Sequence, residues 1–238
     1  MAAPTSESGE GPPEGASERS LAAGGAAPYG NFPDYSRFHP PEELSTALYR
    51  HLLGYGESET SHGHSVPGRD LCLLCCDIDP GLIERAKQHS PFPGAISYAT
   101  LDIMDINARE MLLSSYLSRF GRSAFDICFC MSVTMWIHLN HGDSGLVKFL
   151  SCLASKCTYL LIEPQPWKCY RAAARRLRKL GRNDFDHFRL LTISGNMAEK
   201  ITQILAKDCA MELMCCFGST SWDRSILLFK STLPEHLL

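Results

Sequence analysis

The feature that most constrains the fold of this chain is an alternation of short apolar runs with segments of helical periodicity. Buried strands read as short apolar runs, and their alternation with helices is typical of a parallel sheet. We expect strands at Leu71–Cys76, Ile96–Leu101, Phe125–Cys130, Thr158–Ile162, Met211–Phe217 and Arg224–Lys230. We expect helices at Glu43–Gly54, Pro80–His89, Ala108–Phe120, Gly142–Ala154, Trp167–Leu180 and Met197–Lys207. The sequence therefore predicts an α/β fold with a mostly parallel sheet and flanking helices.

Residues 1–28 differ from the rest of the chain, because Gly, Ala, Ser, Pro and Glu dominate them and large apolar side chains are almost absent. A segment of this composition cannot bury enough apolar surface to offset the conformational entropy lost on folding. The remaining residues, 29–238, are enough for one substantial hydrophobic core. We therefore predict a disordered tail over residues 1–28 and a single folded domain over residues 29–238.

Composition narrows the function classes and the compartment. The net charge of -3 provides no global attraction to nucleic acid, so any RNA contact must come from a local basic patch. Most of the 11 cysteines lie within apolar runs as small hydrophobes, which favours a reducing compartment, the cytosol or the nucleus. No apolar run is long enough to span a membrane, and the first residues lack a signal-peptide pattern. We expect no membrane association, and the sequence does not indicate an oligomeric state.

Two aspartates stand where a parallel sheet binds its ligands, at the carboxyl ends of expected strands. Asp77 ends the run LCLLCC, where a carboxylate can accept hydrogen bonds from both hydroxyls of a ribose. Asp79 is the better cap for the following helix, which leaves Asp77 for a ligand. Asp102 ends the run AISYATL, where it either accepts a hydrogen bond from an adenine amine or simply forms a turn. These alternatives for Asp102 are equally open from the sequence.

The tract WIHLNHGDSGL follows the expected strand FDICFC and reads as a polar loop at the end of that strand. His138 and Asn140 are candidates for hydrogen-bond donors to a phosphate. His138 and His141 have no further ligands at matching spacing, so we expect no metal site. Asp143 is expected to cap the helix that follows.

The tract EPQPW after the strand YLLI contains two prolines, which end the strand and stiffen the loop. Its Glu163, Gln165 and Trp167 would lie on the same rim of the sheet as the two aspartates. Trp167 is alternatively a core residue.

Cations at helical spacing follow that loop without interleaved acids, and we read them as a face for the RNA backbone. They are Arg171, Arg175, Arg178 and Arg182, with Lys168 and Lys179 beside them. The alternative is a merely solvated face. Near the start of the domain, aromatic residues surround Tyr35 and Arg37, which can stack on a base or hold a phosphate. The alternative for that segment is a hydrophobic latch of the tail.

Several blocks together resemble the Bicoid-interacting family of RNA 5′-phosphate methyltransferases. They are GNFPDYSRFHPPE, LCCDIDP, FCMSVTMWIHLNHGDSGL, EPQPWKCYRAAARRLRKLG and GSTSWDRSILLF, and they extend from residue 29 to residue 230. The resemblance implies a Rossmann-like class I methyltransferase fold, with Asp77, Asp102, Ile103 and Met131 in contact with S-adenosylmethionine. It also implies transfer of a methyl group to the 5′-monophosphate of small RNAs, with histidine tRNA and microRNA precursors as substrates, in the cytoplasm.

The chain departs from the family pattern in one place. The family has a first strand and a glycine-rich loop for the methionine end of the cofactor between its HPPE segment and the next helix, whereas Glu42 here runs directly into ELSTALYRHLLG. The fold is therefore expected to lack its first strand. Neither GEGPPEG nor GHSVPG follows a strand and opens a helix, as a substitute must.

Three hypotheses about function follow. The first is an active RNA 5′-monophosphate methyltransferase, which needs no general base because the second phosphate pKa of about 6 leaves the nucleophile mostly ionised. The second is a catalytically impaired variant that retains RNA binding but does not bind the cofactor. The third is a redox or metal protein based on Cys72, Cys75 and Cys76, which the position of these residues within one apolar strand disfavours.

Overall fold

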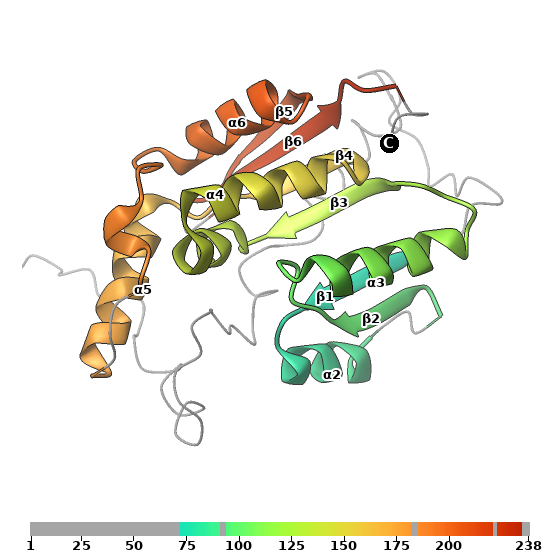
Figure 1. Ribbon diagram of the computed structural model, residues 1–238, viewed down its shortest axis with the longest axis horizontal. Coiled ribbons are helices and arrows are strands. Elements are labelled where there is room, and N and C mark those ends of the chain that lie inside the picture. Colours follow the sequence, from blue (N-terminus) through green and yellow to red (C-terminus); the bar gives the residue numbers. More distant parts are fainter. Residues whose placement is uncertain (1–71, 91–93, 182–184, 221–222, 235–238) are drawn as a thin grey trace, which may run out of the picture.

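The computed structural model describes residues 72–90, 94–181, 185–220 and 223–234 (Figure 1). Its strands are β1 (Leu73–Asp77), β2 (Ile96–Thr100), β3 (Phe125–Met131), β4 (Cys157–Glu163), β5 (Met211–Ser219) and β6 (Ser225–Ser231). Its helices are α2 (Pro80–Gln88), α3 (Ile106–Ser118), α4 (Thr134–Ala154), α5 (Trp167–Lys179) and α6 (Met197–Asp208), with the 3₁₀ helix η3 (Phe188–Leu190). The expected α/β fold is confirmed, and most elements agree with their expected bounds within two residues.

The described strands form two separate sheets. β1 and β2 pair in parallel, with Leu73 opposite Ile96. The second sheet has the order β3-β4-β6-β5, in which β3 and β4 are parallel and β6 is antiparallel to both of its neighbours. Among the described residues no strand pairs with the edges of β1 and β3 that are turned away from β2 and β4. Among the described strands the sheet is therefore divided between β1 and β3.

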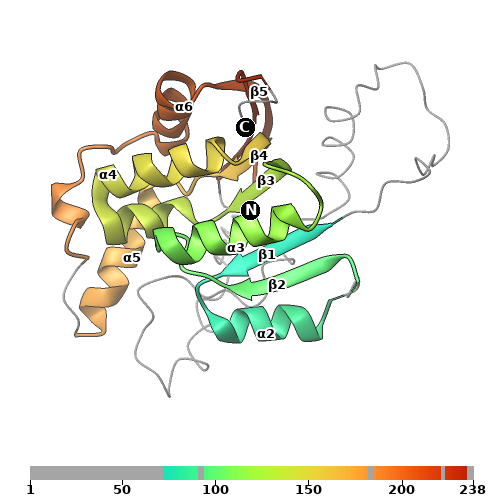
Figure 2. The same ribbon diagram turned by 45° about the vertical axis from the view of Figure 1, so that its right-hand side comes forward.

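The main core lies between the four-stranded sheet and helices α4, α5 and α6. Leu160, Ile162 and Phe229 point from the sheet into this core, where they meet Leu150 and Leu205, and none of the five has measurable exposure. Figure 2 shows α4 and α6 over the same face of the sheet. Each buried side chain of this size stabilises the fold by about 1.5–3 kcal/mol through the hydrophobic effect. This core holds the start of α4 and the whole of α5 in fixed positions.

Helix α4 corrects the prediction of a polar loop followed by a helix from Gly142. The helix already begins at Thr134 and includes the tract WIHLNHGDSGL, with a kink at Gly142 (φ 68°, ψ -173°). This backbone conformation is essentially restricted to glycine. A Cβ at Gly142 would also meet Nδ1 of His187 at 3.2 Å. The polar residues of the tract are therefore helical residues; His138 is buried, Asn140 and Asp143 are partly buried, and His141 and Ser144 are exposed.

Some expectations lie outside the described residues. They are the disordered tail over residues 1–28, the helix at residues 43–54, the first strand residue Leu71, the candidate ligands Tyr35 and Arg37, and Arg182. No helix in the described part of the chain combines the length and the apolar character that crossing a membrane requires.

Candidate functional site

The carboxyl ends of three parallel strands bring the expected cofactor residues to one edge of the fold. Asp77 is the last residue of β1, Asp102 and Ile103 follow β2, and Met131 ends β3. The arrowheads of these strands point to the same side in Figure 1. The edge lies where the chain order of the strands reverses, and in open α/β sheets ligands bind at such a point.

Local hydrogen bonds fix the orientation of both aspartates. The Asp77 carboxylate accepts a bond from the backbone N–H of Asp79 at 2.8 Å, and Asp102 accepts one from Met104 N–H at 2.9 Å. Asp79 in turn caps α2 through bonds from Gly81 and Leu82, as expected. Burial raises the pKa of Asp77, although the backbone amide of Asp79 opposes this. A carboxylate has about four lone-pair sites, so each aspartate retains acceptor capacity for a ligand.

Gln165 of the EPQPW tract ties the end of β4 to the start of α4. Its Oε1 accepts bonds from the Thr134 hydroxyl at 3.0 Å and from Met135 N–H at 3.1 Å. Its Nε2 donates to the carbonyl of Ser132, a residue with φ of 56°. The Ser132 hydroxyl donates to Glu163 and lies close to Arg224. This tract therefore fixes the turn between β3 and α4, and Gln165 itself is 1% exposed.

His138 occupies the interior, so the structure does not support its predicted role as a direct phosphate ligand. The side chain has no exposure, its Nε2 lies 2.7 Å from Oδ1 of Asp143, and its Nδ1 lies 3.2 Å from the hydroxyl of Tyr170. Burial lowers the pKa of His138, although Asp143 opposes this. A neutral ring that donates from Nε2 to Asp143 and accepts at Nδ1 from Tyr170 satisfies both contacts. His138 thereby joins α4 to α5.

Asp143 and Asn140 also form internal contacts that differ from the expectation. Asp143 does not cap its own helix; it accepts bonds from Thr192 N–H at 2.8 Å, from the Thr192 hydroxyl and from Ile193 N–H at 3.3 Å. Asn140 is partly buried, and its Nδ2 donates to the carbonyl of Trp136 at 2.8 Å. Asp143 therefore holds the loop at Thr192, which lies 49 residues further along the chain.

We expect Asp143→Asn to remove a stabilising contribution that depends on pH. Burial raises the pKa of Asp143, but the bonds from Thr192, His138 and the backbone outweigh it and lower the pKa to about 2. A lowered carboxyl pKa stabilises the fold above the unfolded value of about 4, and this stability is lost as the pH falls towards 2. For this shift the loss is about 2 kcal/mol. Urea unfolding from pH 5 to pH 2 measures it.

The matched control for that measurement is Asp126→Asn, because Asp126 forms only an exposed ion pair with Arg122. The control should keep the acid sensitivity of the parent protein, whereas Asp143→Asn should flatten it. Equal acid profiles of the two variants would contradict the assigned role of Asp143.

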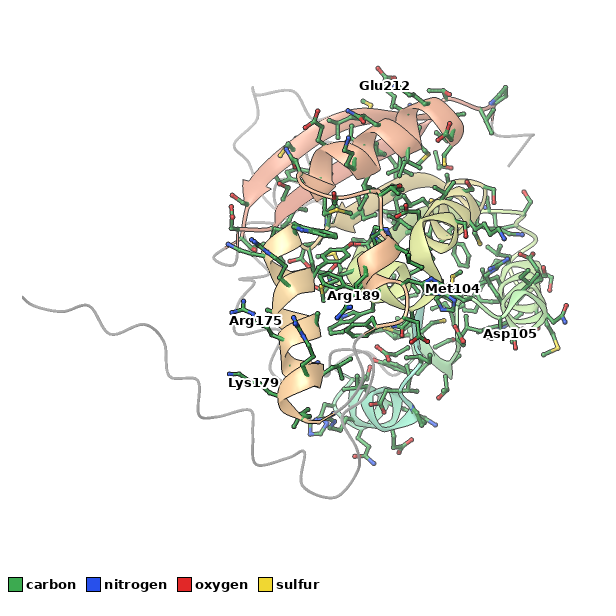
Figure 3. All side chains as sticks on the ribbon, turned by 60° about the vertical axis from the view of Figure 1, so that its left-hand side comes forward. Met104, Asp105, Arg175, Lys179, Arg189 and Glu212 are labelled. Atoms are coloured by element: carbon green, nitrogen blue, oxygen red, sulfur yellow. The ribbon has the colours of Figure 1, made fainter. Side chains whose placement is uncertain are left out.

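The basic helix α5 borders a cavity of about 470 Å³ that is lined by Trp167, Arg171, Arg175, Arg178 and Phe188. The three arginines are exposed and share one face of the helix at spacings of three and four residues. Figure 3 shows Arg175 and Lys179 projecting to the same side, away from the sheet. In the described part of the chain no carboxylate forms an ion pair with Arg171 or Arg175. The cavity thus combines cations with aromatic surface.

The aromatic part of this cavity comes from two segments, one of which the sequence did not indicate. The rings of Trp167 and Phe188 are stacked, with centroids 5.9 Å apart and an interplanar angle of 23°. Trp167 also stacks on Tyr170 at 4.7 Å and packs against the main core, which agrees with the alternative expectation for Trp167. Phe188 belongs to the short helix η3, which is too short for a periodic pattern, although the aromatic tract FDHF was a detectable signal.

Comparison with known proteins identifies the family. The family model described as Bicoid-interacting protein 3 matches residues 125–231. The RNA 5′-monophosphate methyltransferase of Rattus norvegicus is 56% identical over 247 residues, which cover 89% of this chain and 86% of the rat protein. This chain belongs to the Bicoid-interacting protein 3 family. The human relative of the same name is 53% identical over 274 residues, covering 99% of this chain and 93% of the human protein.

A further relative and one solved structure are also similar to this Bicoid-interacting protein 3 family member. The pre-miRNA 5′-monophosphate methyltransferase of Xenopus laevis is 53% identical over 244 residues, covering 87% of this chain and 93% of that protein. Among solved structures, the N-methyltransferase NodS of Bradyrhizobium japonicum in complex with S-adenosyl-L-homocysteine is 16% identical, with a TM-score of 0.42. It covers 68% of this chain and 67% of its own.

S-adenosylmethionine is the cofactor of the methyltransferases in this family, and the described residues fit only one half of it. Asp77 ends β1 and Asp102 follows the neighbouring strand β2, and their carboxylates suit ribose hydroxyls and an adenine amine; Ile103 also follows β2, and Met131 ends β3. The methionine half would need backbone N–H groups of a glycine-rich turn at the strand reversal. No such turn lies between β1 and β3 among the described residues. In the same ranges no group of three His, Cys, Asp or Glu side chains is placed to hold a metal ion.

Proposed function

We propose that this chain transfers a methyl group from S-adenosylmethionine to the 5′-monophosphate of small RNAs, among them histidine tRNA and microRNA precursors. The observation that carries the proposal is the identity of more than half of the aligned residues to the rat and human RNA 5′-monophosphate methyltransferases. A cysteine-rich chain whose 11 cysteines are all free supports a location in the reducing cytoplasm.

The α5 cavity is the proposed contact surface for the RNA. Arg171, Arg175 and Arg178 provide a row of guanidinium groups, each of which can bind a phosphate through two parallel hydrogen bonds. Trp167 and Phe188 provide apolar rings, on which an unpaired base at the end of an RNA can stack. α5 directly follows the end of β4, beyond the strand ends that carry Asp77 and Asp102. In the proposed arrangement an RNA held on α5 extends its 5′ end towards the cofactor edge.

In the proposed reaction these residues position the reactants and do not transfer protons. A phosphate monoester is mostly dianionic at neutral pH, because its second pKa is about 6, so its oxygen is already nucleophilic. The cofactor supplies a sulfonium methyl group. Asp77 and Asp102 would orient the adenosine part, while the arginines of α5 hold the RNA, and alignment of the reacting atoms then supplies most of the acceleration. We assign no general base.

His138 and Gln165 are buried residues that hold α5 and the start of α4 in place. His138 holds Tyr170 of α5, and Gln165 fixes the turn that precedes α4. The guanidinium of Arg176 lies over the ring of Trp136 on α4, with its Cζ 5.9 Å from the ring centroid. These contacts position the basic helix, so the family tracts act on the RNA surface indirectly.

Labelled methyl transfer to two RNAs of one sequence tests the proposed function. We expect transfer to the RNA with a 5′-monophosphate and none to the RNA with a 5′-hydroxyl. The assay includes this chain and a version into which the positions present only in the human relative are restored. Transfer to both RNAs, or no transfer by this chain, would overturn the proposed function; transfer by the restored version alone would assign the loss of activity to the missing positions.

A further inference from the structure

Arg176 differs from the other arginines of α5 in its surroundings. It follows Arg175 by one residue, which places it about 100° further round the helix, and it does not line the α5 cavity. The three arginines that line the cavity are exposed, whereas Arg176 is partly buried. Its guanidinium lies over the ring of Trp136. Arg176 therefore belongs to a second surface of α5, which lies between this helix and the start of α4.

Trp136 connects this second surface to the end of a parallel strand. It lies in the first turn of α4, where its N–H donates to the carbonyl of Val133 at 2.9 Å, and Met131, the last residue of β3, precedes that turn. The ring of Phe185 packs against the ring of Trp136, with the two centroids 6.3 Å apart. In open α/β sheets ligands bind at the carboxyl ends of the strands. The pair of Arg176 and Trp136 therefore adjoins the ligand-binding end of β3.

The positive charge of Arg176 is not balanced by the residues that the structure describes. An arginine side chain stays ionised in proteins, and partial removal from water disfavours the cation unless an anion or hydrogen-bond acceptors replace the water. The Nε of Arg176 is buried and forms no hydrogen bond to a described residue, and no carboxylate in the described ranges forms an ion pair with this side chain. The face of Trp136 compensates only part of the lost hydration. An anionic ligand would supply the remainder.

The terminal phosphate of an RNA suits this position better than a phosphate of the RNA backbone. A guanidinium over an aromatic ring keeps N–H groups at its edge, which can donate two parallel hydrogen bonds to two phosphate oxygens. A phosphate monoester presents three acceptor oxygens and close to two negative charges at neutral pH, whereas a backbone phosphate carries one charge. The exposed row of cavity arginines matches a repeating backbone, and a single partly buried arginine matches a single terminal group.

We propose that Arg176, held against Trp136, binds the 5′-terminal phosphate of the RNA and determines the preference for 5′-monophosphorylated RNA. The inference rests on the proposed function and deepens it, because it assigns recognition of the terminal phosphate to one residue. The cavity arginines then hold the body of the RNA without distinguishing its 5′ end. The alternative is that Arg176 only fastens α5 to α4.

Binding of two RNAs of one sequence, one with a 5′-monophosphate and one with a 5′-hydroxyl, tests the proposal without methyl transfer. We expect the parent protein to bind the phosphorylated RNA on the order of 10-fold more tightly, which is the contribution of a charge-assisted hydrogen bond. Arg176→Gln should make the two affinities equal. Arg175→Gln removes the same charge from the cavity, so it should weaken both RNAs alike and keep their ratio. Equal affinities in the parent protein, or an unchanged ratio in Arg176→Gln, would overturn the proposal.

A second variant separates phosphate recognition from the packing on Trp136. Arg176→Lys keeps the positive charge and the contact with the aromatic ring, but it loses the two-donor geometry of the guanidinium. We expect it to unfold at the same temperature as the parent protein and to show a smaller preference for the phosphorylated RNA. The alternative, a purely structural role, predicts that both Arg176 variants keep the parent ratio, and this result would overturn the proposal. A preference that depends on Arg176 without any methyl transfer would count against the proposed function alone.

Discussion

Replacement of Gln165 by Leu is expected to lower the free energy of unfolding by about 3–5 kcal/mol, because three buried groups lose their partner together. The Thr134 hydroxyl, the Met135 N–H and the Ser132 carbonyl all bond to the Gln165 amide. Leucine has a similar volume, so the loss measures the hydrogen bonds and not a cavity. Urea unfolding of the two proteins at pH 7 determines the difference.

Two further variants make that measurement specific. Thr134→Val removes only the bond from the Thr134 hydroxyl and leaves the Gln165 amide bonded to Met135 and Ser132, so its loss should be smaller than that of Gln165→Leu. Gln88→Leu, on the exposed last turn of α2, should change stability by no more than about 0.5 kcal/mol. A loss below 1 kcal/mol in Gln165→Leu would mean that the turn before α4 does not depend on this amide.

The strands and most helices were predictable from the sequence because their signals are local. The apolar runs place β1, β2, β3 and β4 within two residues of their ends, and Asp79 followed by Pro80 marks the start of α2. The expectation that the first strand is missing came from comparison with the family pattern, in which a strand and a glycine-rich loop stand between the counterparts of Glu42 and the next helix. Such elements need no knowledge of partners distant in the sequence.

The candidate site was less predictable, because its polar residues are satisfied by distant partners. The sequence suggests that His138 is a surface ligand. In the structure its Nδ1 instead contacts the hydroxyl of Tyr170, which lies 32 residues further along the chain. From the sequence Asp143 is expected to cap a helix, whereas in the structure it accepts hydrogen bonds from Thr192. Asp77 and Asp102, by contrast, occupy the expected strand ends, because their position depends only on the strands that precede them.

The structure assigns a shared role to tracts that the sequence treated as separate ligand groups. WIHLNHGDSGL, EPQPW and the loop with Thr192 meet through Gln165, His138 and Asp143. Their common effect is to fix α5 relative to the ends of the parallel strands. The surface that we propose for RNA contact is then the outer side of α5, whose sequence contains no acid to oppose its positive charge.

Replacement of Arg171, Arg175 and Arg178 together by Gln is expected to weaken RNA binding on the order of 100-fold at 0.1 M salt. Each phosphate contact with a single strand contributes a slope of about 0.7 to the dependence of log affinity on log salt, so the slope should fall by about 2. The three side chains are exposed, and glutamine retains the helix, so the fold should be unaffected. Titration of a labelled 5′-monophosphate RNA at several salt concentrations measures both quantities.

The same charge change on another surface provides the control. Lys148, Lys200 and Lys207 are exposed on α4 and α6, and their replacement by Gln alters the net charge by the same three units. If α5 is the binding face, this variant should keep the parent slope, since contacts and not net charge release the counterions. Equal weakening in both variants would assign the binding to overall charge. Retained affinity in the α5 variant would place the RNA on a different surface, because the loss of three phosphate contacts cannot be silent in the salt dependence.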